Sequence, residues 1–333
     1  MVNLCKGELL RWQTSPSILE GSYYIRRVKL YITFFLTLIV TMAYSELPTE
    51  DYEAYRAELD YFETADGKIA YLDKGDGPVV LLVHGVPTSS WLYVKVANDL
   101  LNRGFRVIAP DLLGYGASDK PEGYELYHQE KQGGRLLALM DYLGVETWTH
   151  VCHDVGGLWT WEMLSQSTGR VERLVILNTI MFDDGFKPPM RFKRNGWAKF
   201  YTWLYKSKWG SKMMMKATLK NGLSKNTKVS KARMKGFYKP MQEGGNRAIY
   251  HFFTQTCHLM PDYSALFDSL EMPVHVIWGA QDPMLVWEPQ KDLVKVSLDL
   301  DDENITVLEE SVHFIQEEEP EVIAEVIEGF VME

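Results

Sequence analysis

Residues 149–157, with the sequence THVCHDVGG, combine the local pattern and the side chain best suited to chemistry. The β-branched run predicts a strand that breaks into a tight turn, after which residues 158–164 have a helical pattern. Cys152, two positions before the centre of the turn, is small, and Gly156, two positions after it, has no side chain, as a crowded strand-to-helix turn requires. Asp154 is therefore predicted to stand at the carboxyl end of a sheet, where the amino end of the next helix favours its ionised form.

An aspartate in this turn has a different chemistry from the serine that is common there. A carboxylate that attacks saturated carbon leaves an alkyl ester, which water can cleave, whereas a serine would leave an inert ether. Asp154 therefore points to the opening of carbon–halogen bonds or epoxides rather than of esters or amides. For this stretch alone, the alternative is an ordinary aspartate that caps a helix.

A nucleophilic carboxylate needs a base for the ester-cleaving step and a group that orients this base. Asp282 directly follows the predicted strand 273–280, and His313 follows the predicted strand 305–308. Both lie in loops at the carboxyl ends of strands, where open α/β sheets hold their active sites. The order along the chain predicts Asp154 as nucleophile, Asp282 as orienting acid and His313 as general base.

Two backbone N–H groups are the positional candidates for an oxyanion hole. Val86 lies in the loop after the predicted strand 78–83, and Val155 directly follows the nucleophile. His84 and His153 flank the site and are interpreted as structural histidines that fix loops.

The elements that position these residues alternate between strand and helix. An Asp-Gly hairpin over residues 61–72 precedes apolar strands at 78–83, 105–111 and 173–178, and helices are predicted near 128–143 and 318–331. This alternation predicts an α/β fold with a doubly wound, mostly parallel sheet. The predicted core comprises residues 51–182 and 256–333. Residues 183–255, rich in Lys, Met and Trp, are predicted to form a helical cap over the site.

Composition limits the partners of the chain. The 333 residues carry a formal net charge of −10, which excludes nucleic acid as a partner. The three cysteines have no zinc or disulfide spacing, and no phosphate-binding glycine loop or dinucleotide motif occurs, so no metal and no cofactor are expected. A small organic molecule and water are the predicted reactants.

The predicted cap differs in charge from the rest of the chain. Residues 183–255 carry 17 Lys or Arg and 3 Asp or Glu, a net charge of +14. These charges either steer anionic substrates to the site or form a solvated basic face that touches an anionic membrane through residues 212–216. The sequence leaves both interpretations open.

The first 50 residues have the pattern of an N-terminal leader. In segment 28–45 an apolar run of 14 residues follows a basic flank and precedes Ala43-Tyr44-Ser45, as in a secretory signal with a small-x-small cleavage site. The run is short for a spanning helix, which needs roughly 20 apolar residues. We expect export to the periplasm or the medium. The alternative is an uncleaved segment that associates with the membrane as an anchor.

With these residues identified, the chain resembles the α/β-hydrolase superfamily over residues 57–333. The resemblance is to its aspartate-nucleophile branch of haloalkane dehalogenases and epoxide hydrolases. Residues 84–93 (HGVPTSSWLY), residues 109–121 (APDLLGYGASDKP), Leu177-Asn178 and the position of Asp282 look more like dehalogenases. The resemblance implies that Asp154, Asp282 and His313 form a catalytic triad as nucleophile, orienting acid and base. It also implies that the backbone amides of Val86 and Val155 form the oxyanion hole.

The chain departs from this family at the leaving-group position. Haloalkane dehalogenases usually have a tryptophan after the nucleophile, whose indole N–H holds the halide, and Val155 stands there; Val86 replaces the asparagine of another variant. Donors from the cap are predicted instead, either indoles or the phenols with which epoxide hydrolases protonate the opening oxygen. The candidates are Trp197, Trp203 and Tyr238, with Trp209, Tyr201, Tyr205 and Tyr250 as further possibilities.

The sequence thus predicts a hydrolase that displaces a leaving group from saturated carbon through an alkyl-enzyme ester. A haloalkane dehalogenase-like activity is the first expectation, and an epoxide hydrolase is the alternative. A non-catalytic ligand-binding protein on a hydrolase fold is a second alternative.

Overall fold

The computed structural model of the chain describes residues 46–188, 190–258 and 260–332. Residues Glu46–Glu333 form one compact unit. The predicted signal or anchor segment, residues 28–45, lies outside the described residues. Within the described part, no helix has the length and apolar character needed to cross a membrane.

Eight strands form one sheet in this unit, in the order β1-β2-β4-β3-β5-β6-β7-β8. β1 and β2 form the predicted hairpin, and β2 also pairs antiparallel with β4, whereas all pairings from β4 to β8 are parallel. The strands are β1 (Asp60–Thr64), β2 (Gly67–Lys74), β3 (Val79–Val83), β4 (Arg106–Pro110), β5 (Trp148–Asp154), β6 (Val171–Thr179), β7 (Val274–Gly279) and β8 (Ile305–Leu308). The predicted doubly wound, mostly parallel sheet is confirmed.

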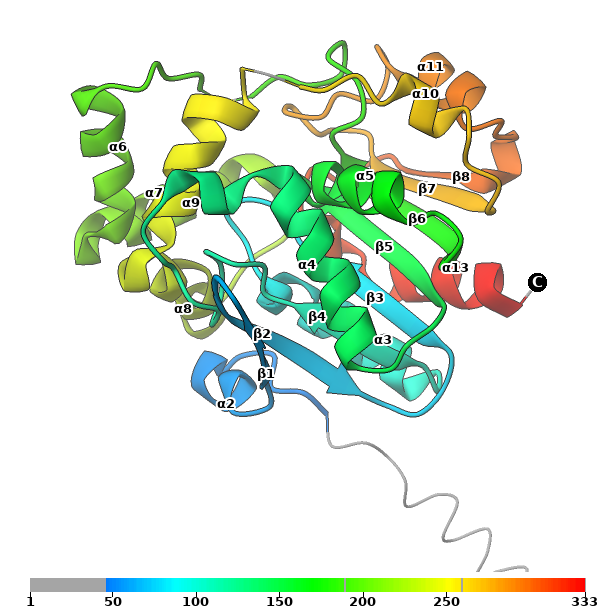
Figure 1. Cartoon of the computed structure of the whole chain (residues 1–333), viewed down its shortest axis with the longest axis horizontal. Helices are drawn as coiled ribbons and strands as arrows, with labels where there is room; N and C mark the ends of the chain where they lie inside the picture. Colours follow the sequence, from blue (N-terminus) through cyan, green and yellow to red (C-terminus); the bar gives the residue numbers. More distant parts are fainter. Residues whose placement is uncertain (1–45, 189, 259, 333) are drawn as a thin grey trace, which may run out of the picture. The chain divides into compact units, whose positions relative to one another are not determined.

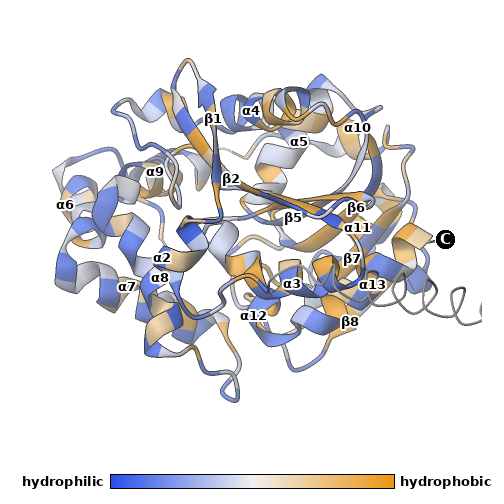
Figure 2. Cartoon of the chain, turned by 90° about the horizontal axis from the view of Figure 1, so that it is seen from below, coloured by the Kyte–Doolittle hydropathy of each residue, from blue (hydrophilic) through white to orange (hydrophobic). Residues whose placement is uncertain are grey.

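Helices cover both faces of the sheet, as the continuous apolar strands require. Figure 2 shows α4 (Gln129–Tyr142) and α5 (Gly156–Gln166) over one face, with α3 (Val94–Asn102) and α13 (Pro320–Met332) over the other. α4 packs against α5, and α3 packs against α13. The strands between these layers are therefore buried along most of their length.

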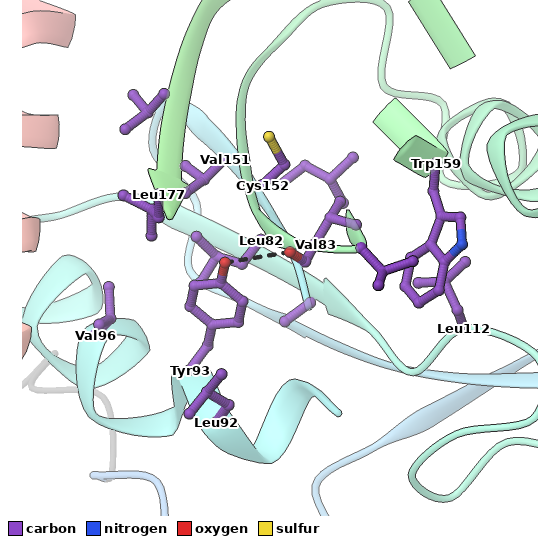
Figure 3. Packing of buried hydrophobic residues seen from close by; sticks show 14 of the residues in the cluster. Leu82, Val83, Leu92, Tyr93, Val96, Leu112, Val151, Cys152, Trp159 and Leu177 are labelled. Carbon is purple, nitrogen blue, oxygen red and sulfur yellow. Dashed lines mark hydrogen bonds between the residues drawn. The ribbon is translucent and has the colours of Figure 1, made fainter. Parts of the chain in front are cut away.

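Figure 3 shows a central part of the core, where β3 and β5 run side by side and the chain segment with the short helix η1 (Ser90–Tyr93) and α3 packs against them. Leu82, Val151 and Leu177 come from three neighbouring strands and are fully buried. The Tyr93 hydroxyl, in η1, donates a hydrogen bond of 3.2 Å to the carbonyl of Val83. This packing fixes the carboxyl ends of β3 and β5, from which the candidate site is built.

A group of helices lies between β6 and β7 in the chain, within residues 196–256, and gathers at one end of the described unit (Figure 1). We call these helices the cap. Ser207 ends the first of these helices, and its side chain caps the second by accepting a hydrogen bond of 2.9 Å from the Gly210 N–H. The cap elements are α6 (Gly196–Lys206), α7 (Lys208–Gly222), α8 (Lys231–Pro240), the π-helical turn η3 (Met241–Gly245), α9 (Asn246–His251) and the π-helical turn η4 (Phe252–Thr256).

The remaining helices of the described residues are short and lie outside the cap. They are α2 (Tyr52–Arg56), η2 (Tyr124–Tyr127), α10 (Ser264–Phe267), α11 (Lys291–Ser297), η5 (Asp302–Asn304) and α12 (Ile315–Glu318). The predicted helices near 128–143 and 318–331 correspond to α4 and α13.

Candidate active site

Asp154 is the last residue of β5 and lies in the sharp turn that the sequence predicts. Its φ of 55° is in the left-handed region, which a non-glycine residue rarely occupies. A Cβ at Gly156 would stand 2.6 Å from the carbonyl oxygen of His84, so only glycine permits this approach of α5 to the loop after β3. The strained turn places the Asp154 side chain beyond the end of the sheet.

Backbone amides hold the carboxylate of Asp154. The Val86 N–H donates a hydrogen bond of 2.6 Å to Asp154 Oδ1. Gly85 makes this possible, because a Cβ there would stand 2.3 Å from the same oxygen. The N–H of Val155 also favours the charged carboxylate. Both predicted oxyanion-hole residues therefore face the carboxylate of Asp154.

The structure brings Asp282 and His313 to the same edge of the sheet. His313 Nδ1 lies 2.7 Å from Asp282 Oδ2, and His313 Nε2 lies 3.7 Å from Asp154 Oδ2. The Nδ1–H of the imidazole therefore donates to Asp282, and in the neutral ring Nε2 carries the lone pair that faces Asp154. This is the arrangement that a general base oriented by a carboxylate requires.

Asn178 is a further residue of this network that sequence reasoning did not assign. Its Nδ2 donates a hydrogen bond of 2.8 Å to Asp282 Oδ2, and its Oδ1 accepts a hydrogen bond of 2.8 Å from the N–H of Gly279. The N–H groups of Met284 and Leu285 donate to the other oxygen of Asp282. Asn178 thus ties β6 to the loop after β7 and positions Asp282. The signal in the sequence was its place at the end of an apolar strand.

Burial and charge set the ionisation of the three groups. Burial raises the pKa of Asp154, and the charge of His313 and the two backbone amides oppose this rise only in part. Burial alone would also raise the pKa of Asp282, but His313 and the donating amides outweigh it and hold the pKa below its ordinary value. Burial favours neutral His313, yet Asp282 and Asp154 together raise the pKa of this imidazole.

The two flanking histidines are structural, as predicted. His84 Nε2 accepts a hydrogen bond of 3.0 Å from the N–H of Leu112. Nδ1 of the neutral ring therefore carries the proton, and it donates a hydrogen bond of 2.8 Å to the carbonyl of Gly85. His153 Nε2 bonds the carbonyl oxygen of His313 at 2.9 Å, and the two rings are 4.6 Å apart. One histidine fixes the oxyanion loop and the other fixes the loop of the base.

A cavity of about 180 Å³ opens in front of Asp154 and His313. Most of its wall is apolar and comes from cap and core, including Phe186, Met190, Met214, Ile249, Phe252, Phe253 and Phe314. The polar cap side chains that line it are Tyr201 and Tyr205 of α6 and Thr218 and Asn221 of α7. The cavity therefore suits a small, largely apolar molecule with one polar group facing α6 and α7.

The structure corrects the predicted leaving-group donors. Trp197 and Trp203 are 63% and 52% exposed on the outer side of α6, and neither lines the cavity. Tyr238 of α8 lies outside the cavity wall, with the Lys212 ammonium 5.1 Å from its ring centre. Tyr201 and Tyr205, also on α6, line the cavity instead.

Comparison with protein families identifies the fold of this site. The family described as the alpha/beta hydrolase fold matches residues 78–320, which span strands β3 to β8, the helices between β6 and β7, and the three candidate catalytic residues. The chain is an α/β-hydrolase.

Curated relatives of this α/β-hydrolase include haloalkane dehalogenases. Haloalkane dehalogenase 2 of Mycobacterium bovis is 27% identical over 292 residues, which cover 85% of this chain and 98% of the relative. The haloalkane dehalogenase of Psychrobacter cryohalolentis is 25% identical over 299 residues, covering 86% and 95%. This α/β-hydrolase enzyme is thus similar to these haloalkane dehalogenases over almost their full length.

Solved structures show the same fold in hydrolases with other names. An alpha/beta hydrolase fold protein from Burkholderia ambifaria matches with a TM-score of 0.64 at 21% identity and covers 80% of this chain and 96% of that chain. A thermophilic esterase from Thermogutta terrifontis matches with a TM-score of 0.66 at 18% identity, and the match covers 82% of this chain and 98% of the esterase chain. These structures support the fold of the α/β-hydrolase.

In the described part of the α/β-hydrolase, no group of three or more His, Cys, Asp or Glu side chains is arranged to hold a metal ion. Cys152 and Cys257 are both buried and free.

Proposed function

We propose that this enzyme hydrolyses a small apolar substrate through an ester between Asp154 and a saturated carbon of the substrate. The observation that carries the proposal is the unequal environment of the two carboxylate oxygens. Oδ1 is held by the Val86 N–H at 2.6 Å, whereas Oδ2 lies 3.7 Å from His313 Nε2, and both Asp154 and His313 line the cavity. Oδ2 is free to attack, and Oδ1 is already in place to become the carbonyl oxygen of the ester.

The second step follows from the position of the imidazole. Nε2 of His313 is 3.7 Å from Asp154 Oδ2, too long for a hydrogen bond, so its lone pair is available to a water molecule. The water gives a proton to Nε2 and attacks the ester carbon, and Oδ1 takes up negative charge facing the amides of Val86 and Val155. Asp282 stabilises the imidazolium that forms. As this intermediate collapses, Nε2 returns its proton to the departing alkoxide, which leaves as an alcohol, and the carboxyl group then loses one proton and is again a carboxylate.

The cap side of the cavity supports an epoxide as the substrate best. Opening an epoxide places negative charge on a ring oxygen, which needs a proton donor on the side away from Asp154. Tyr201 and Tyr205 supply phenol groups there, and burial raises the pKa of both. Both phenols therefore remain protonated at neutral pH and can donate. The product of this reaction is a diol.

A haloalkane is the second candidate substrate. It is favoured by the names of the curated relatives, which are haloalkane dehalogenases at 25–29% identity. No tryptophan is among the described residues that line the cavity, so the phenol hydroxyls would have to hold the leaving halide. The products would be an alcohol, a halide ion and a proton.

The experiment that tests the proposal traps the ester. His313→Gln removes the base but leaves the nucleophile, so we expect attack without release. Intact-protein mass should rise by the whole mass of an epoxide with nothing set free, or by the alkyl group of a haloalkane with one halide released. Peptide mapping should place the adduct on Asp154.

Asp154→Ala is the matched control, since it removes the attacking oxygen and should give no adduct and no turnover. Turnover by Asp154→Ala would contradict the aspartate nucleophile. Tight binding of both substrate types without turnover or adduct would favour a ligand-binding protein.

A further inference from the structure

The outer side of α6 carries three large aromatic residues that are exposed to solvent. Trp197, Phe200 and Trp203 follow at three-residue intervals and are each at least half exposed. The rings of Trp197 and Phe200 are 5.7 Å apart, and those of Phe200 and Trp203 stack at 6.1 Å. Large apolar side chains that gather on a surface are uncommon unless they contact a partner.

The exposed apolar surface continues along α7, which packs against α6. Trp209 is 70% exposed, and Met213, Ala217 and Asn221 follow it at four-residue intervals on the same side of the helix. Ala217 and Asn221 are exposed and also line the cavity in front of Asp154. The cavity thus reaches the surface at the end of this apolar stripe.

Lysines surround the aromatic residues without acidic partners. α6 and α7 contain six lysines, and the sequence has no Asp or Glu between Asp184 and Glu243. Among the described residues, none of the six forms an ion pair; they are Lys199, Lys206, Lys208, Lys212, Lys216 and Lys220. All six are exposed. Exposed Trp and Phe side chains among unpaired lysines are typical of surfaces that enter the headgroup region of anionic bilayers.

We propose that the exposed side of α6 and α7, which we call the cap surface, docks this protein on an anionic lipid bilayer. The aromatic rings would enter the headgroup region, and the lysines would contact lipid phosphates. A second copy of the chain fits less well, because a two-fold interface would set the six lysines of one cap surface against those of the other. Docking would turn the opening of the cavity toward the lipid, the phase in which apolar molecules accumulate. The proposal does not depend on the reaction at Asp154.

Vesicle sedimentation without substrate tests the proposal. The full chain and the compact unit of residues 46–333 are mixed with vesicles of phosphatidylcholine alone or with about 30% phosphatidylglycerol. We expect residues 46–333 to bind the anionic vesicles about tenfold or more above the neutral ones and to be released by 0.5 M salt.

Two triple variants of residues 46–333 separate the contributions. Trp197→Ser with Trp203→Ser and Trp209→Ser removes the rings, and Lys199→Glu with Lys206→Glu and Lys216→Glu reverses three charges. Each should lower binding by about tenfold or more. The control is Leu293→Ser with Val296→Ser, which removes two exposed apolar residues from α11 and should leave binding unchanged. Thermal melting verifies that all variants fold.

Three results would overturn the proposal. The first is that residues 46–333 do not sediment with anionic vesicles. The second is that the two triple variants bind as the unchanged protein does, or that the α11 control loses as much binding as they do. The third is a dimer in solution that the tryptophan variant dissociates, because the cap surface would then be an interface between two copies of the chain.

Discussion

Tyr201 and Tyr205 lie one turn apart on α6, and their rings are 6.1 Å from each other. Both line the cavity that contains the Asp154 carboxylate. A phenol that gives its proton to an opening epoxide has a stronger effect than one that only hydrogen-bonds a halide, because a halide leaves as a stable anion. The two substrate types should therefore respond differently when a phenol is removed.

We expect Tyr201→Phe and Tyr205→Phe, singly and together, to slow epoxide opening by about 10²–10³-fold, the usual effect of losing a charge-stabilising donor. Haloalkane displacement should change much less. Single-turnover rates of adduct formation in the His313→Gln background measure both reactions directly. Tyr238→Phe, a cap phenol outside the cavity, is the control and should have no effect. Equal losses for both substrates would mean that the phenols only shape the cavity.

The triad could be predicted from the sequence because local pattern fixes the ends of strands. Asp154, Asp282 and His313 each follow an apolar run, and parallel strands bring such ends to one edge. The cap donors could not be predicted in the same way. α6 has aromatic residues around much of its circumference, so its sequence does not tell which of them line the cavity. Only the packing of the folded chain decides that Tyr201 and Tyr205 line it while Trp197 and Trp203 are exposed.

Among the elements, α8 of the cap and α12 of the core are joined by a buried ion pair. Arg233 and Glu317 are almost fully buried, and Arg233 Nε donates to the two carboxylate oxygens at 2.7 and 2.8 Å. The Arg233 guanidinium also lies 4.8 Å from the ring centre of Trp91 and donates to the carbonyl of Thr49 at 2.8 Å. Lys95 contacts Glu317 as well. These contacts fix the cap above the candidate site.

Glu317→Ala should lower the free energy of unfolding by about 3–5 kcal/mol, because it leaves the buried guanidinium without its counter-charge. Urea denaturation measures the change. The double variant Arg233→Met with Glu317→Leu removes both charges and keeps apolar volume, so it should recover most of the loss. A double variant no more stable than Glu317→Ala would show that the surrounding packing, not the unpaired charge, sets the cost.

The ion pair between α8 and α12 is an example of a contact between elements that the sequence does not predict. The strands were predictable from continuous apolar runs, and α4 and α13 from their periodicity. The contact of Arg233 with Glu317 joins positions far apart in the chain, and nothing in the local sequence distinguishes this arginine from the other basic residues of the cap. An ion pair that depends on how distant segments pack produces no recognisable pattern in the sequence around either residue.

At the scale of the whole molecule, several histidines are buried in neutral form. Burial lowers the pKa of His150 to about 3 and, together with the nearby charges of His128 and Arg194, lowers that of His251 to about 3. Burial also lowers the pKa of His84 and of His153. In an unfolded chain each of these groups titrates near its ordinary value of about 6.5.

The stability of the fold should therefore depend on pH in a defined window. Between pH 6.5 and 3 the unfolded chain binds more protons at His150 and His251 than the folded protein, so acid favours unfolding there. In this window each histidine should lower the free energy of unfolding by about 1.4 kcal/mol for each pH unit of acidification. Neither histidine contributes to this slope above pH 6.5. His251→Phe should reduce the slope by about this amount between pH 6 and 4 in urea denaturation. An unchanged slope would mean that His251 does not stay neutral in the folded state.

The unequal distribution of charge gives the protein an electric dipole moment. Residues 183–255 are net positive, with +14, in a chain whose total is −10, and the basic helices lie together at one end of the described unit. A dipole near a charged surface experiences a torque within a few Debye lengths, each about 8 Å at physiological salt. The molecule would thus rotate before contact, and it would meet an anionic surface with the mouth of its cavity already turned toward it.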